Sequence, residues 1–395
     1  MLSVGNLYPP HTGGYELLWQ AAVRHLRGRG HAVRVLTTHL IPPGGDNDPD
    51  VFRELRWYWR DHEWPPTTPR QRLALERHNV RVFGDHVAAF RPDVVAWWAM
   101  GGMSQGLIEQ ARRRVLPAVG FVIDDWMAYG PRTDQWTSTW ARRPRLGRAA
   151  AALTRLPTRV DYDRSARWTF CSETTRATAI GEAGPLSDTG LLHPGVDPVF
   201  ARDAVPNAWE WRLLYAGRVD PRKGIATAVE ALVHLPDEAK LRVIGSGDER
   251  HAAELTDRVE ALGLTARVTF EPARDRARLA DGYAAADVTL FPGEWQEPWG
   301  LVPLESMAAG RPVVATGRGG SGEYLRGGEN CLLFAPGDPR ALADAVRRLA
   351  SDEALRERIV AGGRRTAAGL SEQAWLEGVE REHVSRVTLR AWRSS

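Results

Sequence analysis

Two carboxylates, Glu297 and Glu305, lie eight positions apart in the stretch FPGEWQEPWGLVPLESMAAGRPVVAT, residues 291–316. The stretch reads as the end of a buried strand, a Gly- and Pro-containing loop, a helix from about Leu301 to Ala309 and a strand at Pro312–Ala315. The first N–H groups of such a helix lack internal partners and lie at the positive end of its dipole, so they form an anion site. Carboxylates beside an anion suit hydroxyl pairs instead, such as those of sugars and riboses.

A plainer interpretation makes Glu297 a solvated loop charge and Glu305 an N-terminal helix acid that suits the dipole. The complete stretch argues against this interpretation, because it also contains Pro298 and Gly300 before the helix and an apolar strand after it.

Two cations lie in a second loop, GRVDPRKG, residues 217–224, between a strand at Trp211–Ala216 and a helix at Ile225–Leu232. Arg218 and Lys223 project from one strand–helix connection, so both can contact the same anion. The arginine fork matches phosphate oxygens, and lysine adds a compact charge. Ordinary surface charges are the alternative.

The string EPWGLVPLE resembles the E-x7-E signature of the large retaining glycosyltransferase family 4-like group, which has the GT-B fold and uses nucleotide-sugar donors. The loop GRVDPRKG matches that family closely as well. The resemblance spans nearly the whole chain, is strongest from Gly217 to Phe334, and is weaker before Ser172. It implies that Glu297 contacts hydroxyls of the donor sugar and that Glu305 holds the ribose.

The resemblance also implies roles around the diphosphate. Backbone N–H groups of Gly300, Leu301 and Val302 approach it, and Arg218 and Lys223 stabilise the negative charge that grows as it leaves. A donor phosphate oxygen, rather than a side chain, takes the acceptor proton.

Other donor contacts come from the neighbouring strand ends. Gly217 and Gly245 let the nucleotide approach, and the loop Glu271–Arg274, including Arg274, lies where the family's backbone reads the base. The expected donor is a nucleoside-diphosphate sugar, with a UDP-sugar favoured. It is a co-substrate, and neither a cofactor nor a metal is implied.

The N-terminal strand, Leu2–Gly5, leads through a loop into a helix and then the strand Ala32–Thr37, which predicts a parallel sheet. Gly13 and Gly14 fall at the carboxyl end of the first strand, where ligands usually bind. The resemblance favours contact with the donor and acceptor, and a plain turn that needs φ > 0 is the alternative.

Asp124, Asp125 and Trp126 follow the strand Ala118–Ile123. The family commonly has a histidine before an aspartate here, whereas this chain has Ile123. Asp124 or Asp125 is expected to orient an acceptor hydroxyl or amine, and helix capping is the alternative. Two adjacent acids do not make a metal site.

Tryptophan is unusually abundant, with 16 residues. An aromatic wall against the acceptor is one predicted use, and packing is the other. The side chains considered for the wall are Trp57, Tyr58, Trp59, Trp64, Trp97, Trp98 and Trp126.

The segment Ala141–Arg159 carries six arginines among alanines and leucines. A solvated helical face is the default interpretation, and binding of an anionic membrane or a phosphorylated acceptor stays open.

The 395 residues argue for two domains, with α/β architecture throughout. We expect two Rossmann-like domains facing across a cleft: residues 1–200 for the acceptor, 201–370 for the nucleotide sugar, and a helix at 371–395 that crosses back to the first domain.

Composition bounds the remaining classes. A net charge of +3 is too weak for a nucleic-acid binder, and the two cysteines are expected to be buried free thiols. The absence of a leader or of an apolar run long enough to span a bilayer predicts a cytoplasmic location. Oligomeric state is left open.

A dehydrogenase is excluded because the nearest match to G-x-G-x-x-G, Gly245–Arg250, lacks its third glycine. A phosphorylase, a nucleotide-sugar epimerase and a non-catalytic binding module stay open as alternatives to transfer. The acceptor classes considered are a small polyol, a natural-product scaffold, a sugar and a lipid-linked saccharide, with a small soluble acceptor favoured.

Overall fold

The computed structural model describes residues 1–9, 13–40, 48–59, 64–202 and 208–394. The chain divides into two compact units: Met1–His193 together with Leu376–Ser395 forms the first, and Pro194–Trp375 forms the second. Each unit is a parallel sheet with helices, so the predicted α/β class with two Rossmann-like units is confirmed.

The described strands of the first unit form a seven-stranded parallel sheet in the order β3-β2-β1-β4-β5-β6-β7. The order reverses between β1 and β4, which places a topological switch point at the middle of the sheet. The strands are β1 Leu2–Val4, β2 Arg34–Thr38, β3 Val51–Leu55, β4 Val95–Trp97, β5 Ala118–Val122, β6 Arg167–Phe170 and β7 Thr189–Leu191.

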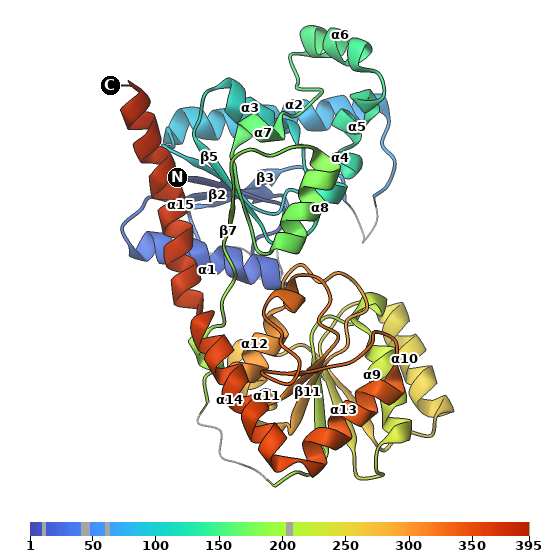
Figure 1. Ribbon diagram of the computed structural model, residues 1–395. Helices are drawn as coiled ribbons and strands as arrows, with labels where there is room; N and C mark the ends of the chain where they lie inside the picture. The colour runs from blue at the N-terminus through green and yellow to red at the C-terminus, as the bar shows by residue number, and fades with distance from the viewer. Residues whose placement is uncertain (10–12, 41–47, 60–63, 203–207, 395) are drawn as a thin grey trace. The chain divides into compact units, whose positions relative to one another are not determined.

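Helix α1 lies on one face of this sheet and α2 and α3 lie on the other, while α6 projects away from both (Figure 1). The helices are α1 Gly14–Gly28, α2 Pro69–Phe90, α3 Gly106–Arg113, α4 Trp126–Thr133, α5 Gln135–Ala141, α6 Pro144–Thr154, α7 Tyr162–Ser165, α8 Glu173–Ala183 and α15 Glu372–Ser394.

The second unit holds, in its described part, a six-stranded parallel sheet in the order β10-β9-β8-β11-β12-β13. Helices α11 and α12 lie to one side of it and α9 and α10 to the other (Figure 1). The strands are β8 Arg212–Ala216, β9 Lys240–Ile244, β10 Val268–Glu271, β11 Val288–Phe291, β12 Val313–Ala315 and β13 Leu332–Leu333. The helices are α9 Ile225–Ala231, α10 Glu249–Ala261, α11 Arg276–Ala285, α12 Leu301–Ala308, α13 Pro339–Ser351 and α14 Glu353–Gly369.

Strand β3 ends at Leu55. The next backbone groups are diverted to a side chain: the N–H of Arg56 donates to Asn79 Oδ1 at 2.7 Å, and its carbonyl accepts from Asn79 Nδ2 at 2.9 Å. The Asn79 side chain therefore replaces the hydrogen bonds that a neighbouring strand would make with Arg56. The chain then turns away from the sheet toward α2.

The C-terminal helix α15 packs on the first unit, as predicted. Glu380 accepts hydrogen bonds from ring nitrogens of His31 at 3.0 Å and His25 at 3.3 Å. Further along the helix, Arg167 Nε donates to Glu382 at 2.7 Å.

Several tryptophans considered for an acceptor wall are part of the core. Trp97, Trp98 and Trp126 are at most 1% exposed. Trp98 stacks on Phe121 with ring centroids 4.7 Å apart, and Trp126 meets Trp168 edge-on at 5.8 Å. The wall prediction is wrong for these three residues, because no ring face is open to a ligand; the packing interpretation holds.

A carboxyl group is buried under the sheet of the first unit. Glu76 Oε1 accepts from Tyr58 Oη and Ser104 Oγ, each at 2.7 Å, and within the described chain Oε2 has no hydrogen-bond partner. Burial, with the nearby buried Asp134 as a second cause, raises the pKa of Glu76 well above that of an ordinary carboxyl group.

We predict that Glu76→Gln flattens the pH dependence of unfolding. A folded-state pKa above the unfolded value contributes stability at low pH that is lost as pH rises through the folded pKa. The variant lacks this ionisation, so at pH 9 it should be more stable than wild type by on the order of 2 kcal/mol. Urea unfolding at pH 5, 7 and 9 measures this, with the exposed Glu238→Gln as control. Equal slopes for wild type and Glu76→Gln would contradict the assignment.

Candidate functional site

The candidate site lies in the second unit at the carboxyl ends of neighbouring strands. The loops after β8, β9 and β11 all leave the same edge of the sheet, and β8 and β11 flank the point where the strand order reverses. Ligands of open parallel sheets bind at this position. Most of the donor-site residues predicted from the sequence are in these loops or in α12.

A carboxylate and an ammonium meet at the centre of this site. Lys223 Nζ donates to Glu297 Oε2 at 2.6 Å, and Trp295 Nε1 donates to the same oxygen at 2.9 Å. The ammonium also lies 4.9 Å from the centre of the Trp295 ring. The two loops are therefore held together by a charge-assisted contact with an aromatic face beside it.

Arg218 occupies the start of the same loop. Its side chain is exposed, and in the part of the chain that the structure describes its guanidinium makes no hydrogen bond or ion pair. Its carbonyl is fixed by Tyr215 Oη, which donates to it at 2.8 Å. The backbone is thus held while five donor N–H groups stay available to an anion.

The loops after β8 and β9 touch through backbone, which explains one glycine. A Cβ at Gly245 would lie 1.8 Å from the carbonyl oxygen of Gly217, so no other residue fits there. Gly217 itself has a φ of +141°. These glycines let the two loops approach each other; whether they also let a nucleotide approach stays a prediction.

Helix α12 begins where the sequence predicts. Gly300 has a φ of +89°, and its carbonyl accepts from Tyr324 Oη. The chain then enters the helix at Leu301 and Val302, and Gly310, with a φ of +68°, follows its end. The first turn carries no acid, so the positive end of the helix dipole is left for an anion.

Glu305 lies within α12 and faces the neighbouring helix. Its Oε2 accepts from Tyr283 Oη at 2.7 Å, and burial raises its pKa to about 6. Arg276 lowers that pKa in turn, and this guanidinium is itself held by Asp197 at 2.5 Å and Glu372 at 3.1 Å. These contacts hold the Glu305 carboxyl group in place, and its role at a ribose stays a prediction.

Arg274 is engaged within the protein. Its guanidinium pairs with Glu271, whose carboxylate also pairs with Arg242 at 2.8 Å. The nearby N–H of Ala273 donates to Ser246 Oγ at 3.2 Å. The loop after β10 is thus tied to the loop after β9.

The predicted residues of the first unit are more dispersed. Asp124 Oδ1 accepts from the N–H of Trp126 at 3.1 Å and Oδ2 from Tyr129 Oη at 3.2 Å, so Asp124 caps the start of α4. Burial raises the pKa of Asp124 to about 7. Asp125 is the residue before the helix, with a φ of −84°. The capping interpretation of Asp124 describes these contacts, and acceptor binding by either acid stays a prediction.

Gly13 and Gly14 begin helix α1. Gly13 is extended, with a φ of −133°, and a Cβ at Gly14 would meet nothing within 4 Å. The alternative of a turn that needs φ > 0 is therefore wrong for both. Residues 10–12 of the same loop lie outside the described residues.

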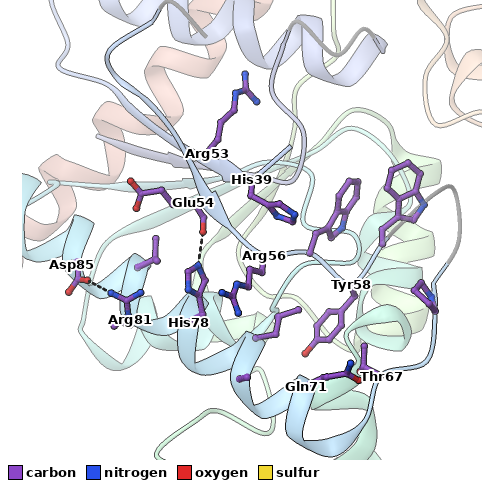
Figure 2. Close-up of a pocket in the computed structure, with 16 residues that line it drawn as sticks. His39, Arg53, Glu54, Arg56, Tyr58, Thr67, Gln71, His78, Arg81 and Asp85 are labelled. Atoms are coloured by element: carbon purple, nitrogen blue, oxygen red, sulfur yellow. Dashed lines mark hydrogen bonds and ion pairs between the residues drawn. The ribbon is translucent and has the colours of Figure 1, made fainter. Parts of the chain in front are cut away.

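A cavity of about 720 Å³ lies in the first unit between the end of β3 and α2. Figure 2 shows His39, Arg56 and His78 gathered there. Trp57 and Trp59 also line it, with ring centroids 4.7 Å apart, so this part of the predicted aromatic surface does border a cavity.

Sequence reasoning missed the two histidines and Arg56. In the sequence these residues are separate polar positions near strand ends and on a helix. Their distance along the chain does not show that α2 packs beside β3 and brings them together. Within the described chain the guanidinium of Arg56 has no hydrogen-bond or ion-pair partner.

Comparison with known proteins places this geometry in a family. The sequence model for "Glycosyltransferase Family 4" matches residues 12–200, and that for "Glycosyl transferases group 1" matches residues 201–366. A Rhizobium meliloti lipopolysaccharide core biosynthesis glycosyltransferase is 31% identical over 62% of this chain and 71% of its own length. The chain therefore belongs to the family 4-like glycosyltransferases with the GT-B fold.

Other relatives match over shorter regions. A D-inositol 3-phosphate glycosyltransferase of Xylanimonas cellulosilytica is 41% identical over 38% of this chain and 37% of its own length. A phosphatidyl-myo-inositol mannosyltransferase of Mycobacterium leprae is 39% identical over 38% of this chain and 40% of its own length. The chain thus spans less than half of these two relatives.

Solved structures support the fold. Anabaena HepE in complex with UDP-glucose has a TM-score of 0.69 at 19% identity and covers 98% of this chain and 100% of its own. Sucrose-phosphate synthase of Thermosynechococcus elongatus has a TM-score of 0.74 at 22% identity, with 100% of each chain covered.

We predict that Lys223→Ala lowers release of nucleoside diphosphate from a donor by on the order of 100-fold, because a charge contact to the leaving group is lost. Arg222→Ala is the matched control. Arg222 also lies over the Trp295 ring, at 4.5 Å, but its guanidinium pairs with Asp220 at 2.7 Å. Steady-state diphosphate release measures both variants. Equal losses in the two variants would show a general effect on the loop and contradict a specific role for Lys223.

Proposed function

We propose that this protein transfers a glycosyl group, with retention of anomeric configuration, from a nucleoside-diphosphate sugar to a hydroxyl of a small acceptor or saccharide. The observation that supports it best is the contact of Lys223 with Glu297 at 2.6 Å; in the described chain the same loop carries the exposed Arg218, whose guanidinium has no hydrogen-bond or ion-pair partner. Cations for a diphosphate and a carboxylate for sugar hydroxyls occur in adjoining loops, as such a donor requires.

The reaction breaks the bond between the anomeric carbon and a phosphate oxygen of the donor. The leaving diphosphate gains negative charge, which we expect Lys223, Arg218 and the first N–H groups of α12 to stabilise. The acceptor oxygen bonds to the anomeric carbon on the same face, and its proton goes to the departing phosphate oxygen. No side chain has to carry that proton.

In this scheme the hydrogen-bond partners of Glu297 change when a donor binds. The Glu297 carboxylate accepts from Lys223 and Trp295. When a donor binds, the phosphate draws the ammonium, and Glu297 then accepts from hydroxyls of the donor sugar. The ion pair therefore keeps both groups oriented until the donor replaces part of it.

The choice of donor rests on the comparisons. One solved relative is described in complex with UDP-glucose, and we extend a UDP-sugar donor to this chain as part of the proposal. The names of two curated relatives include an inositol that carries phosphate. A hydroxyl-rich, phosphorylated acceptor is therefore the first class to test.

We assign such an acceptor to the cavity between β3 and α2. Its guanidinium at Arg56 matches a phosphate, and Trp57 and Trp59 offer faces to the C–H groups of a ring. His39 and His78 add ring nitrogens, although both already contact backbone carbonyls, at 3.2 and 2.8 Å.

We predict that the protein with UDP-glucose and myo-inositol 3-phosphate forms a glycoside of the donor's anomeric configuration and releases UDP. Proton NMR of the product reads the configuration from the anomeric coupling. An inverted product would contradict retention. Release of UDP with water alone, or consumption of inorganic phosphate, would instead support an epimerase or a phosphorylase.

We predict that Arg56→Gln weakens binding of myo-inositol 3-phosphate by about tenfold or more and leaves binding of unphosphorylated myo-inositol unchanged. Calorimetric titration measures both ligands. Arg77→Gln, an exposed arginine of α2 that does not line the cavity, is the control. If Arg56→Gln changed neither affinity, the acceptor would bind elsewhere.

A further inference from the structure

Helix α6 of the first unit presents an apolar stripe to solvent. Leu146 is 56% exposed and Leu153 is 87% exposed. They lie seven positions apart, with Ala149 and Ala150 between them, so the four side chains follow one face of the helix. The alignment of two exposed leucines on one short helix makes this face a candidate contact surface.

Residues 141–159, which include α6, form a strongly basic segment. Its arginines are all exposed, and within the described chain none of their guanidinium groups makes an ion pair or hydrogen bond; the segment 141–159 contains no acid. They are Arg142, Arg143, Arg145, Arg148, Arg155 and Arg159.

The helix is attached to the unit along one narrow side. A Cβ at Gly147 would lie 3.1 Å from Trp140 Cβ, and Thr158 Oγ1 donates to the carbonyl of Gly147 at 3.0 Å. Trp136 Nε1 donates to the carbonyl of Pro157 at 2.9 Å and fixes the chain that follows. Helix α6 projects from the rest of the unit (Figure 1), and Leu146 and Leu153 are exposed on it.

We propose that α6 docks this protein on the surface of an anionic lipid bilayer. The docking surface consists of Leu146, Leu153, Arg142, Arg143, Arg145 and Arg155. Arg148 and Arg159 line a cavity with Glu109 and Asp161 and are not part of the docking surface. Leucines enter the boundary between headgroups and acyl chains while the guanidinium groups meet lipid phosphates, the arrangement of an interfacial amphipathic helix.

The combination of charge and apolar surface selects the partner. A nucleic acid or a soluble polyanion would use the arginines but leave the leucines in water. A lipid surface buries both. No described helix of this chain is long and apolar enough to cross a bilayer, so the attachment is peripheral. A helix of 11 residues gives modest, reversible binding that salt weakens.

The proposal is independent of glycosyl transfer and is tested by sedimentation of the full-length protein with lipid vesicles. Vesicles of phosphatidylcholine with 30% phosphatidylglycerol are compared with pure phosphatidylcholine. We expect at least about tenfold tighter binding to the anionic vesicles, and release when the salt concentration is raised from about 0.1 to 1 M.

Two variants separate the contributions. Leu146→Ser with Leu153→Ser removes the apolar stripe, and Arg142→Gln with Arg143→Gln and Arg145→Gln removes three charges. Each should weaken binding to anionic vesicles by about tenfold or more. Thermal unfolding of each variant verifies that the protein is folded.

Matched controls come from the second unit. Val233→Ser with Leu262→Ser removes apolar side chains that are 52% and 39% exposed. Arg340→Gln with Arg348→Gln and Arg365→Gln removes the same charge from exposed positions. Both controls should bind vesicles as wild type does.

Three outcomes would overturn the proposal. The first is equal binding to anionic and neutral vesicles, and the second is vesicle binding that neither α6 variant changes. The third is a loss with the arginine variant only, together with displacement by heparin at low concentration, which would assign the surface to a soluble polyanion.

Discussion

The contact between Lys223 and Glu297 is the interaction on which the rest of the site depends. It joins the loop after β8 to the loop after β11, which are more than seventy positions apart in the chain, at 2.6 Å. Opposite charges that meet across two loops fix the position of each loop relative to the other. The Lys223 ammonium also lies over the ring of Trp295, whose Nε1 donates to Glu297. The ammonium is therefore oriented by both a carboxylate and an aromatic ring. A donor that brings a diphosphate and hydroxyl groups can take over both halves of this contact.

The sheet explains why the contact forms at all. Strands β8 and β11 pair in parallel, so the segments that follow them leave from the same edge. The loop after β9 closes against the loop after β8 through Gly245, where the backbone leaves no room for a side chain. Helix α12 then begins next to the same edge and directs its N–H groups at it. The strands pair because their apolar side chains must be buried. This pairing then determines where Lys223, Glu297 and the start of α12 meet.

The sequence predicted helix boundaries best where glycines mark the ends of a helix. Glycines before and after α12 mark its ends, and the predicted bounds are within about a residue of those observed. It was least informative about tryptophan, because an indole in a core and an indole in a ligand wall satisfy the same apolar pattern; only the neighbouring strands placed Trp98 and Trp126 inside. Glu76 gave no signal, since an acid in a charged helix looks solvated until the sheet beneath it is known. The basic segment 141–159 was recognised, but the exposure of Leu153 required the fold.

We propose that the second unit recognises the diphosphate of its donor through Lys223, Arg218 and the start of α12. Calorimetric titration with UDP, UMP and uridine, at one salt concentration, tests it most directly. We expect UDP to bind at least about tenfold more tightly than UMP and uridine to bind weakest. The difference between UDP and UMP should shrink when Lys223 is replaced by alanine. Equal affinities for UDP and UMP, or a difference that survives the loss of Lys223, would contradict it.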